Sequence, residues 1–149
     1  MGQRKEGKAL GGRVWAALLS FGLIGQIAWV VENMYFNVFL YNTVTGDTGM
    51  IAAMVAASAV VAAVTTLVVG ALSDKLGMRK PIIVTGYLLW GLSVMAFALV
   101  RVSGLERLLG PAKAVQTAAV LVIVLDCVMT FFGSSANDAA FNAWVTDVT

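Results

Sequence analysis

The chain is poor in the residues that catalysis, metal binding and covalent cross-linking require. It contains no histidine and one cysteine, Cys127, which excludes a histidine general base, a cluster of cysteine metal ligands and an internal disulfide framework. No nucleophile, base and orienting group can be combined from its residues, so an enzyme is the least favoured class. With 12% charged residues and a net charge of +2, the chain also lacks the basic surface that nucleic-acid binding needs.

Long apolar runs dominate the sequence instead. The hydrophobic fraction is 60% and the mean hydropathy is +0.88. Residues 48–73 form a run of 26 without a charge and residues 81–100 add 20 more, whereas crossing the hydrocarbon takes roughly 20 residues. We therefore expect an all-α membrane protein with an N-terminal tail at residues 1–13. The four expected transmembrane helices cover about residues 14–41, 49–73, 81–100 and 114–145.

The distribution of basic residues predicts the orientation. With the N-terminus in the cytoplasm, seven of the ten Lys and Arg residues lie on that side and three on the other. Cytoplasmic segments are enriched in these residues, so we expect this orientation in a plasma (inner) membrane. The external segment at residues 101–113 has leucines at helical spacing before Gly110 and Pro111. It is either a short interfacial helix or a solvated loop.

Three carboxylates fall inside the expected spans: Glu32 in the first, and Asp126 and Asp138 in the last. Acidic groups are costly in a membrane and therefore call for a physical reason. Glu32 is expected to bind a proton or cation, to donate a hydrogen bond to a hydroxylated substrate, or to pair with a basic residue. Alternatively it is a structural carboxylate that reaches water at the outer interface. A coupling proton or monovalent cation is the only cofactor-like component that the sequence suggests.

Polar residues at helical spacing accompany these acids. In the last span Ser134, Asp138 and Asn142 recur every four residues, beside the Phe141 and Trp144 rings, and this combination suits a polar, ring-shaped ligand. Helix packing is the alternative for part of that segment. In the first span Glu32 flanks a polar face that we expect to point into protein or a water-filled cavity, formed by Gln26, Trp29, Asn33 and Asn37. The candidate substrate- and ion-binding residues are Trp29, Glu32, Asn33, Asn37, Asp126, Asp138 and Asn142.

A charged hairpin between the second and third spans has a recognisable pattern. The pattern consists of Gly, any three residues, Asp, Arg or Lys, any residue, Gly, any residue, and two residues that are each Arg or Lys. Six positions match it: Gly70, Asp74, Lys75, Gly77, Arg79 and Lys80. We expect Gly70 to let the helix end pack closely on a neighbour and Gly77 to form a tight turn. The hairpin resembles the loop signature of the major facilitator superfamily. The resemblance implies a gating loop in which Asp74 contacts the partner lobe in one transport state.

A closer resemblance rests on Phe21, Gly22 and Gly25 and on the segment at residues 137–144. These residues are similar to the glycoside-pentoside-hexuronide cation symporters, the melibiose permease-like branch. The resemblance implies that Asp138 and Phe141 contribute to cation and sugar binding. Three departures stand against it: Asn142 replaces a Trp, Ala62 and Thr66 replace the helix-two coupling carboxylates, and the loop is shorter than in that branch. Proton coupling through Asp138, Asp126 or Glu32 is then favoured over a sodium site.

These patterns favour a secondary active transporter that works by alternating access, a proton- or cation-coupled symporter of a sugar or similar small polar solute. Its partners would be the solute, the lipid bilayer and missing C-terminal helices, because the chain matches only the first four of an expected twelve. One alternative is a small four-helix proton-coupled multidrug exporter acting as a dimer, which Glu32 fits and the hairpin does not. The other is a membrane scaffold protein whose acids make hydrogen bonds between helices.

Overall fold

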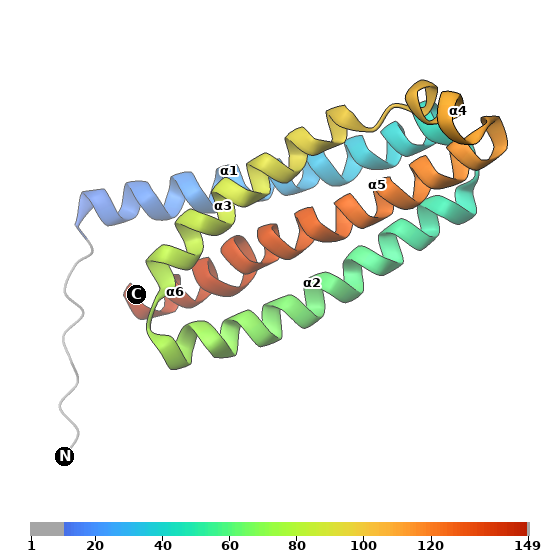
Figure 1. Cartoon of the computed structure of the whole chain (residues 1–149). Coiled ribbons are helices and arrows are strands. Elements are labelled where there is room, and N and C mark those ends of the chain that lie inside the picture. Colours follow the sequence, from blue (N-terminus) through green and yellow to red (C-terminus); the bar gives the residue numbers. More distant parts are fainter. Residues whose placement is uncertain (1–10, 149) are drawn as a thin grey trace, which may run out of the picture.

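The computed structural model describes residues 11–148, and every regular element in this range is a helix (Figure 1). The segments that are long and apolar enough to cross a membrane number four: Gly12–Val44, Thr48–Leu76, Arg79–Leu99 and Lys113–Asp147. For residues 11–148, an all-helical fold with four helices long and apolar enough to cross a membrane is therefore confirmed. Of the expected N-terminal tail, residues 1–10 lie outside the described residues, whereas Gly12 and Arg13 belong to the first helix.

The first half of the chain is a pair of long helices followed by a shorter one. Helix α1 (Gly12–Phe39) continues into the π-helical turn η1 (Leu40–Val44). Helix α2 (Thr48–Leu76) then runs back along the bundle, and α3 (Arg79–Ala96) ends in the 3-10 turn η2 (Phe97–Leu99). Figure 1 shows these segments side by side, with the connection from α2 to α3 at the end of the molecule where α1 begins.

The second half contains a short helix and one long, composite span. Helix α4 (Val102–Leu109) shows that the helix, not the loop, is the correct alternative for the segment after the third span. Helix α5 (Pro111–Gly133) is prolonged by the π-helical segment η3 (Ser134–Phe141) and by α6 (Asn142–Val148). In Figure 1, α4 lies at one end of the bundle and α6 at the other, near the α2 to α3 connection.

Capping residues explain where α2 begins and ends. The Asp47 carboxylate accepts a hydrogen bond of 2.8 Å from the Gly49 N–H, which caps the helix start. At the other end Gly77 adopts a φ of 64° and its N–H bonds the Ser73 carbonyl. Such a left-handed cap favours glycine, and the tight turn expected at Gly77 is confirmed. The charged residues of the hairpin are helical rather than in a loop, because α2 extends past Ser73 and α3 begins directly after Met78.

The distribution of burial is that of a membrane protein. Large apolar side chains lie on the outside, with Leu67 75% exposed and Met95 71% exposed. Buried residues include several hydroxyl groups, among them Ser58 and Thr65 on the packed side of α2. Lipid tails solvate apolar side chains, so helix packing in a membrane favours small and hydrogen-bonding residues inside. The composition and the fold together define an integral membrane protein.

Glycines allow close helix packing, although not at the position expected. A Cβ at Gly86 of α3 would lie 2.7 Å from the Ala136 Cβ of η3, so these two backbones are in near contact. Gly133 is similarly close to the Trp29 and Trp90 rings. The expectation for Gly70 is wrong for the described part of the chain, because a Cβ there would meet nothing within 4 Å. The helix end at Gly70 is too far from its neighbours for a missing side chain to matter.

Candidate functional site

The Glu32 carboxylate lies where α1 faces α3. The indole N–H of Trp90 donates a hydrogen bond of 2.7 Å to Glu32 Oε2. Trp90 is held by an edge-on contact with the Trp29 ring, whose centroid is 6.0 Å away, and is itself only 4% exposed. Phe36 stacks on the Phe97 ring with a centroid distance of 3.9 Å. Trp29, Glu32 and Phe36, at spacings of three and four, are therefore among the α1 residues that contact other helices.

Asp126 lies within electrostatic range of Glu32. It belongs to α5, is 5% exposed, and neighbours both the Ser58 hydroxyl of α2 and the Glu32 charge. Among the described residues, both ion pairs involve Arg79, so neither carboxylate has a basic partner there. One polar centre therefore receives side chains from α1, α2, α3 and α5. Sequence reasoning named its two acids but assigned neither Trp90 nor Ser58 to a site.

Asp138 belongs to a second polar centre, built on η3. The Tyr87 hydroxyl donates to Asn137 Oδ1 at 3.1 Å, and the Asn137 amide donates to Asp138 Oδ1 at 3.2 Å. A Cβ at Gly25 of α1 would lie 2.7 Å from Asn137 Oδ1 and 2.8 Å from the Tyr87 hydroxyl. Only a glycine therefore lets α1 approach this network as it does. Nothing in the spacing of residues along the sequence pointed to Tyr87.

The stripe expected from Ser134 to Asn142 is not a single face. Ser134 is fully buried, Asp138 is partly buried, and Asn142 is exposed with its amide bonded to the Asp138 carbonyl at 2.9 Å. The spacing of four assumed an α-helix. Because backbone hydrogen bonds in a π-helix run from residue i to i+5, η3 rotates these side chains out of line. Such π-helical segments occur frequently at functional sites.

The polar residues expected to share one face of the first span also differ in exposure. Gln26 and Asn33 are exposed on the outside of the described helices, and the Asn33 amide bonds the Trp29 carbonyl at 2.8 Å. Asn37 is partly buried, and its Oδ1 has no hydrogen-bond donor among the described residues. The structure therefore places Glu32 on the packed side of α1 and directs Asn33 away from it.

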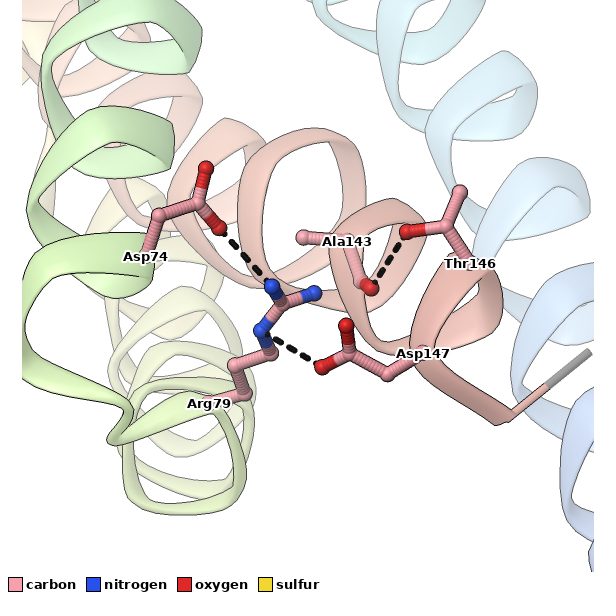
Figure 2. Close-up of polar contacts among 5 residues, drawn as sticks. All are labelled: Asp74, Arg79, Ala143, Thr146 and Asp147. Atoms are coloured by element: carbon pink, nitrogen blue, oxygen red, sulfur yellow. Dashed lines mark hydrogen bonds and ion pairs between the residues drawn. The ribbon is translucent and has the colours of Figure 1, made fainter. Parts of the chain in front are cut away.

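A third polar centre joins three helices at the end of the bundle. Arg79 Nη2 contacts Asp74 Oδ1 at 2.9 Å, and Arg79 Nε contacts Asp147 Oδ2 at 2.9 Å (Figure 2). The arginine side chain is 18% exposed, whereas the two carboxylates are 62% and 53% exposed. Arg79 thus ties α2 and α3 to α6. The hairpin pattern identified Asp74 and Arg79 but not Asp147, which lies 68 residues further along the sequence from Arg79.

The remaining basic residues of the hairpin point into solvent. Lys75 and Lys80 are exposed, and neither takes part in an ion pair between described residues. Comparison with known proteins adds nothing to this geometry: no protein-family model, curated protein or solved structure gives a significant match to the chain. The class defined by the fold and these centres is a helical integral membrane protein with carboxylates inside its apolar helices.

Proposed function

We propose that this protein is a secondary active transporter in which intramembrane carboxylates couple solute movement to a proton or monovalent cation. The observation that carries the proposal is that Glu32 and Asp126 lie within electrostatic range of each other and that neither has an ion-pair partner among the described residues. Two carboxylates within such range in apolar surroundings repel each other and are poorly solvated. They become favourable when a proton or a cation neutralises them, and this property serves coupled transport.

The polar centre at Asp138 supports a role in solute binding. Tyr87, Asn137 and Asp138 offer a hydroxyl, an amide and a carboxylate within one hydrogen-bonded chain. These groups match the hydroxyls of a sugar or a similar small polar solute. In this proposal Asp138 binds the solute, and Glu32 with Asp126 holds the coupling ion.

The hairpin resemblance supports the architecture that we propose, the first four helices of a major facilitator N-terminal lobe. The resemblance implies alternating access, in which the solute site opens to each side in turn. Arg79 and its partners Asp74 and Asp147 would then form a contact that opens and closes with the lobes. We also propose, from the basic-residue distribution, a plasma (inner) membrane location with a cytoplasmic N-terminus.

Uptake by the native gene product, reconstituted in liposomes, tests the function. We expect an inward proton or sodium gradient to drive accumulation of at least one radiolabelled sugar from a panel of mono- and disaccharides. Asp138→Asn should abolish accumulation, and Glu32→Gln should allow exchange of solute without response to the gradient. Normal coupled uptake by Asp138→Asn would remove that residue from the mechanism.

The same preparation distinguishes the alternatives. Intact mass of the native product gives its length, and a product of about 400–500 residues is expected for a major facilitator. A product that ends at Thr149, forms dimers and expels dyes in exchange for entering protons would instead favour the four-helix exporter. Absence of any gradient-driven flux would favour a membrane scaffold.

A further inference from the structure

Two cavities meet at Glu32 along the groove between α1 and α3, which we call the α1–α3 groove. The first has a volume of about 330 Å³ and is walled mainly by aromatic rings, including Tyr35, Phe36 and Phe97. The second has a volume of about 220 Å³ and is lined by Gly25, Ala28, Tyr87, Trp90 and Gly91, among others. Glu32 lines both cavities and is the one charged residue in either lining.

The charge of this groove is not compensated by the described part of the chain. Glu32 accepts a hydrogen bond from Trp90, and the nearest other charge, Asp126, is also negative. The packed helices present Tyr87 and Trp90 of α3 in the lining around Glu32 and Asp126 of α5 within electrostatic range, and none of these residues is basic. A half-buried carboxylate without a basic partner attracts a cation.

The lining determines which cation fits. A hard inorganic cation needs several oxygen ligands, but beside Glu32 the groove has only phenolic hydroxyls, and that of Tyr87 already donates to Asn137. A sugar needs many hydrogen-bonding partners, which apolar walls do not provide. An organic cation needs one carboxylate for its charge and apolar or aromatic surfaces for its body, and aromatic faces attract cations further.

We propose that the α1–α3 groove binds a monovalent organic cation, an ammonium or guanidinium group attached to an aromatic or other apolar body. The cationic group lies against Glu32 beside the Tyr87 and Trp90 rings, and the apolar body occupies the aromatic cavity next to Phe36 and Phe97. Tyr87 lines this site and also belongs to the hydrogen-bonded centre at Asp138, whereas Asp138 itself is in neither lining. The inference rests on the proposed function only in taking the bound cation to be the monovalent cation that Glu32 is proposed to hold; binding itself needs no transport.

Isothermal titration of the full chain in dodecyl maltoside micelles with benzyltrimethylammonium tests the site. We expect saturable binding that Glu32→Gln weakens about tenfold or more, because the substitution removes the charge and keeps the shape. Gly91→Leu should also weaken binding, because a Cβ at Gly91 meets nothing within 4 Å and a leucine there would fill the second cavity.

Matched controls keep the test decisive. Gly104→Leu adds the same side chain on α4, where a Cβ also meets nothing within 4 Å, and should leave binding unchanged. Glu106→Gln removes an exposed acid on α4, outside the groove, and should bind normally. No saturable binding by the unmodified chain, equal affinity in Glu32→Gln, or displacement by equimolar sodium would each overturn the proposal. If binding holds but the native product transports neither cation nor sugar, the site stands and the transport function fails.

Discussion

The contact between α3 and η3 gives a sharp test of the helix packing. A methyl group added at Gly86 would lie 2.7 Å from the Ala136 Cβ, 3.3 Å from its Cα and 3.4 Å from its nitrogen. A methyl group has no alternative rotamer, and two of these three atoms belong to the backbone. The helices must therefore separate to accept it, and overpacking of this kind costs about 1–3 kcal/mol.

Gly91→Ala is the matched control for Gly86→Ala. Gly91 lies on the same helix, but a Cβ there would meet nothing within 4 Å. Both substitutions change helix propensity by the same amount, up to about 1 kcal/mol in favour of alanine, so the difference between them isolates the steric cost. We expect Gly86→Ala to be less stable than Gly91→Ala by about 1–3 kcal/mol.

Reversible unfolding in mixed micelles, titrated with dodecyl sulfate and followed by circular dichroism, measures this difference. Indistinguishable free energies of unfolding for the two variants would refute the reasoning. In that case α3 would not approach η3 closely at Gly86, and the placement of the centres at Glu32 and Asp138 relative to each other would have to be revised.

Three further predictions concern single contacts and use the same unfolding assay. Trp90→Phe removes the indole donor to Glu32 and should cost about 1–3 kcal/mol. A double-mutant cycle with Glu32→Leu, which removes the acceptor, should give a coupling energy of about 1 kcal/mol, and a value near zero would show that the bond contributes nothing. Gly77→Ala forces alanine to a φ of 64° and should cost about 1–2 kcal/mol. Gly70→Ala should be neutral or stabilising, because a Cβ there meets nothing within 4 Å. Equal effects of the two substitutions on stability would contradict the left-handed conformation of Gly77. Arg79→Gln should cost less than about 1 kcal/mol, because Asp74 and Asp147 are largely exposed. It should also reduce the salt dependence of stability, because salt screens exposed ion pairs. A salt dependence equal to that of the unmodified chain would argue against these ion pairs.

Much of the fold was predictable because it depends on local properties. A helix that crosses a membrane needs only enough consecutive apolar residues, and such runs are visible in the sequence. The turn at Gly77 and the break at Gly110, whose φ is 79°, depend on one residue's backbone freedom. The leucine spacing allowed the helix Val102–Leu109 but left a solvated loop as the alternative, and the structure shows the helix.

The candidate site was predictable only as a set of residue types. An acid inside an apolar run is conspicuous, which is why Glu32, Asp126 and Asp138 were all recognised. Their partners were not, because Trp90 follows Glu32 by 58 residues and Tyr87 precedes Asn137 by 50. The sequence spacing of an α-helix also failed in the last span, where η3 has a different period.

The amino-acid sequence by itself determined that this chain forms four apolar helices with a glycine-capped hairpin between the second and third, since hydrophobicity and backbone freedom act over a few residues. Only the tertiary structure decided which side of each helix is packed: Glu32 toward Trp90 and Asp126, Asn33 outward, and Arg79 between Asp74 and Asp147. The physical reason is that lipid accepts any apolar face of a helix. The packed face is therefore selected by close contacts between distant residues, such as Gly25 with Asn137 and Gly86 with Ala136.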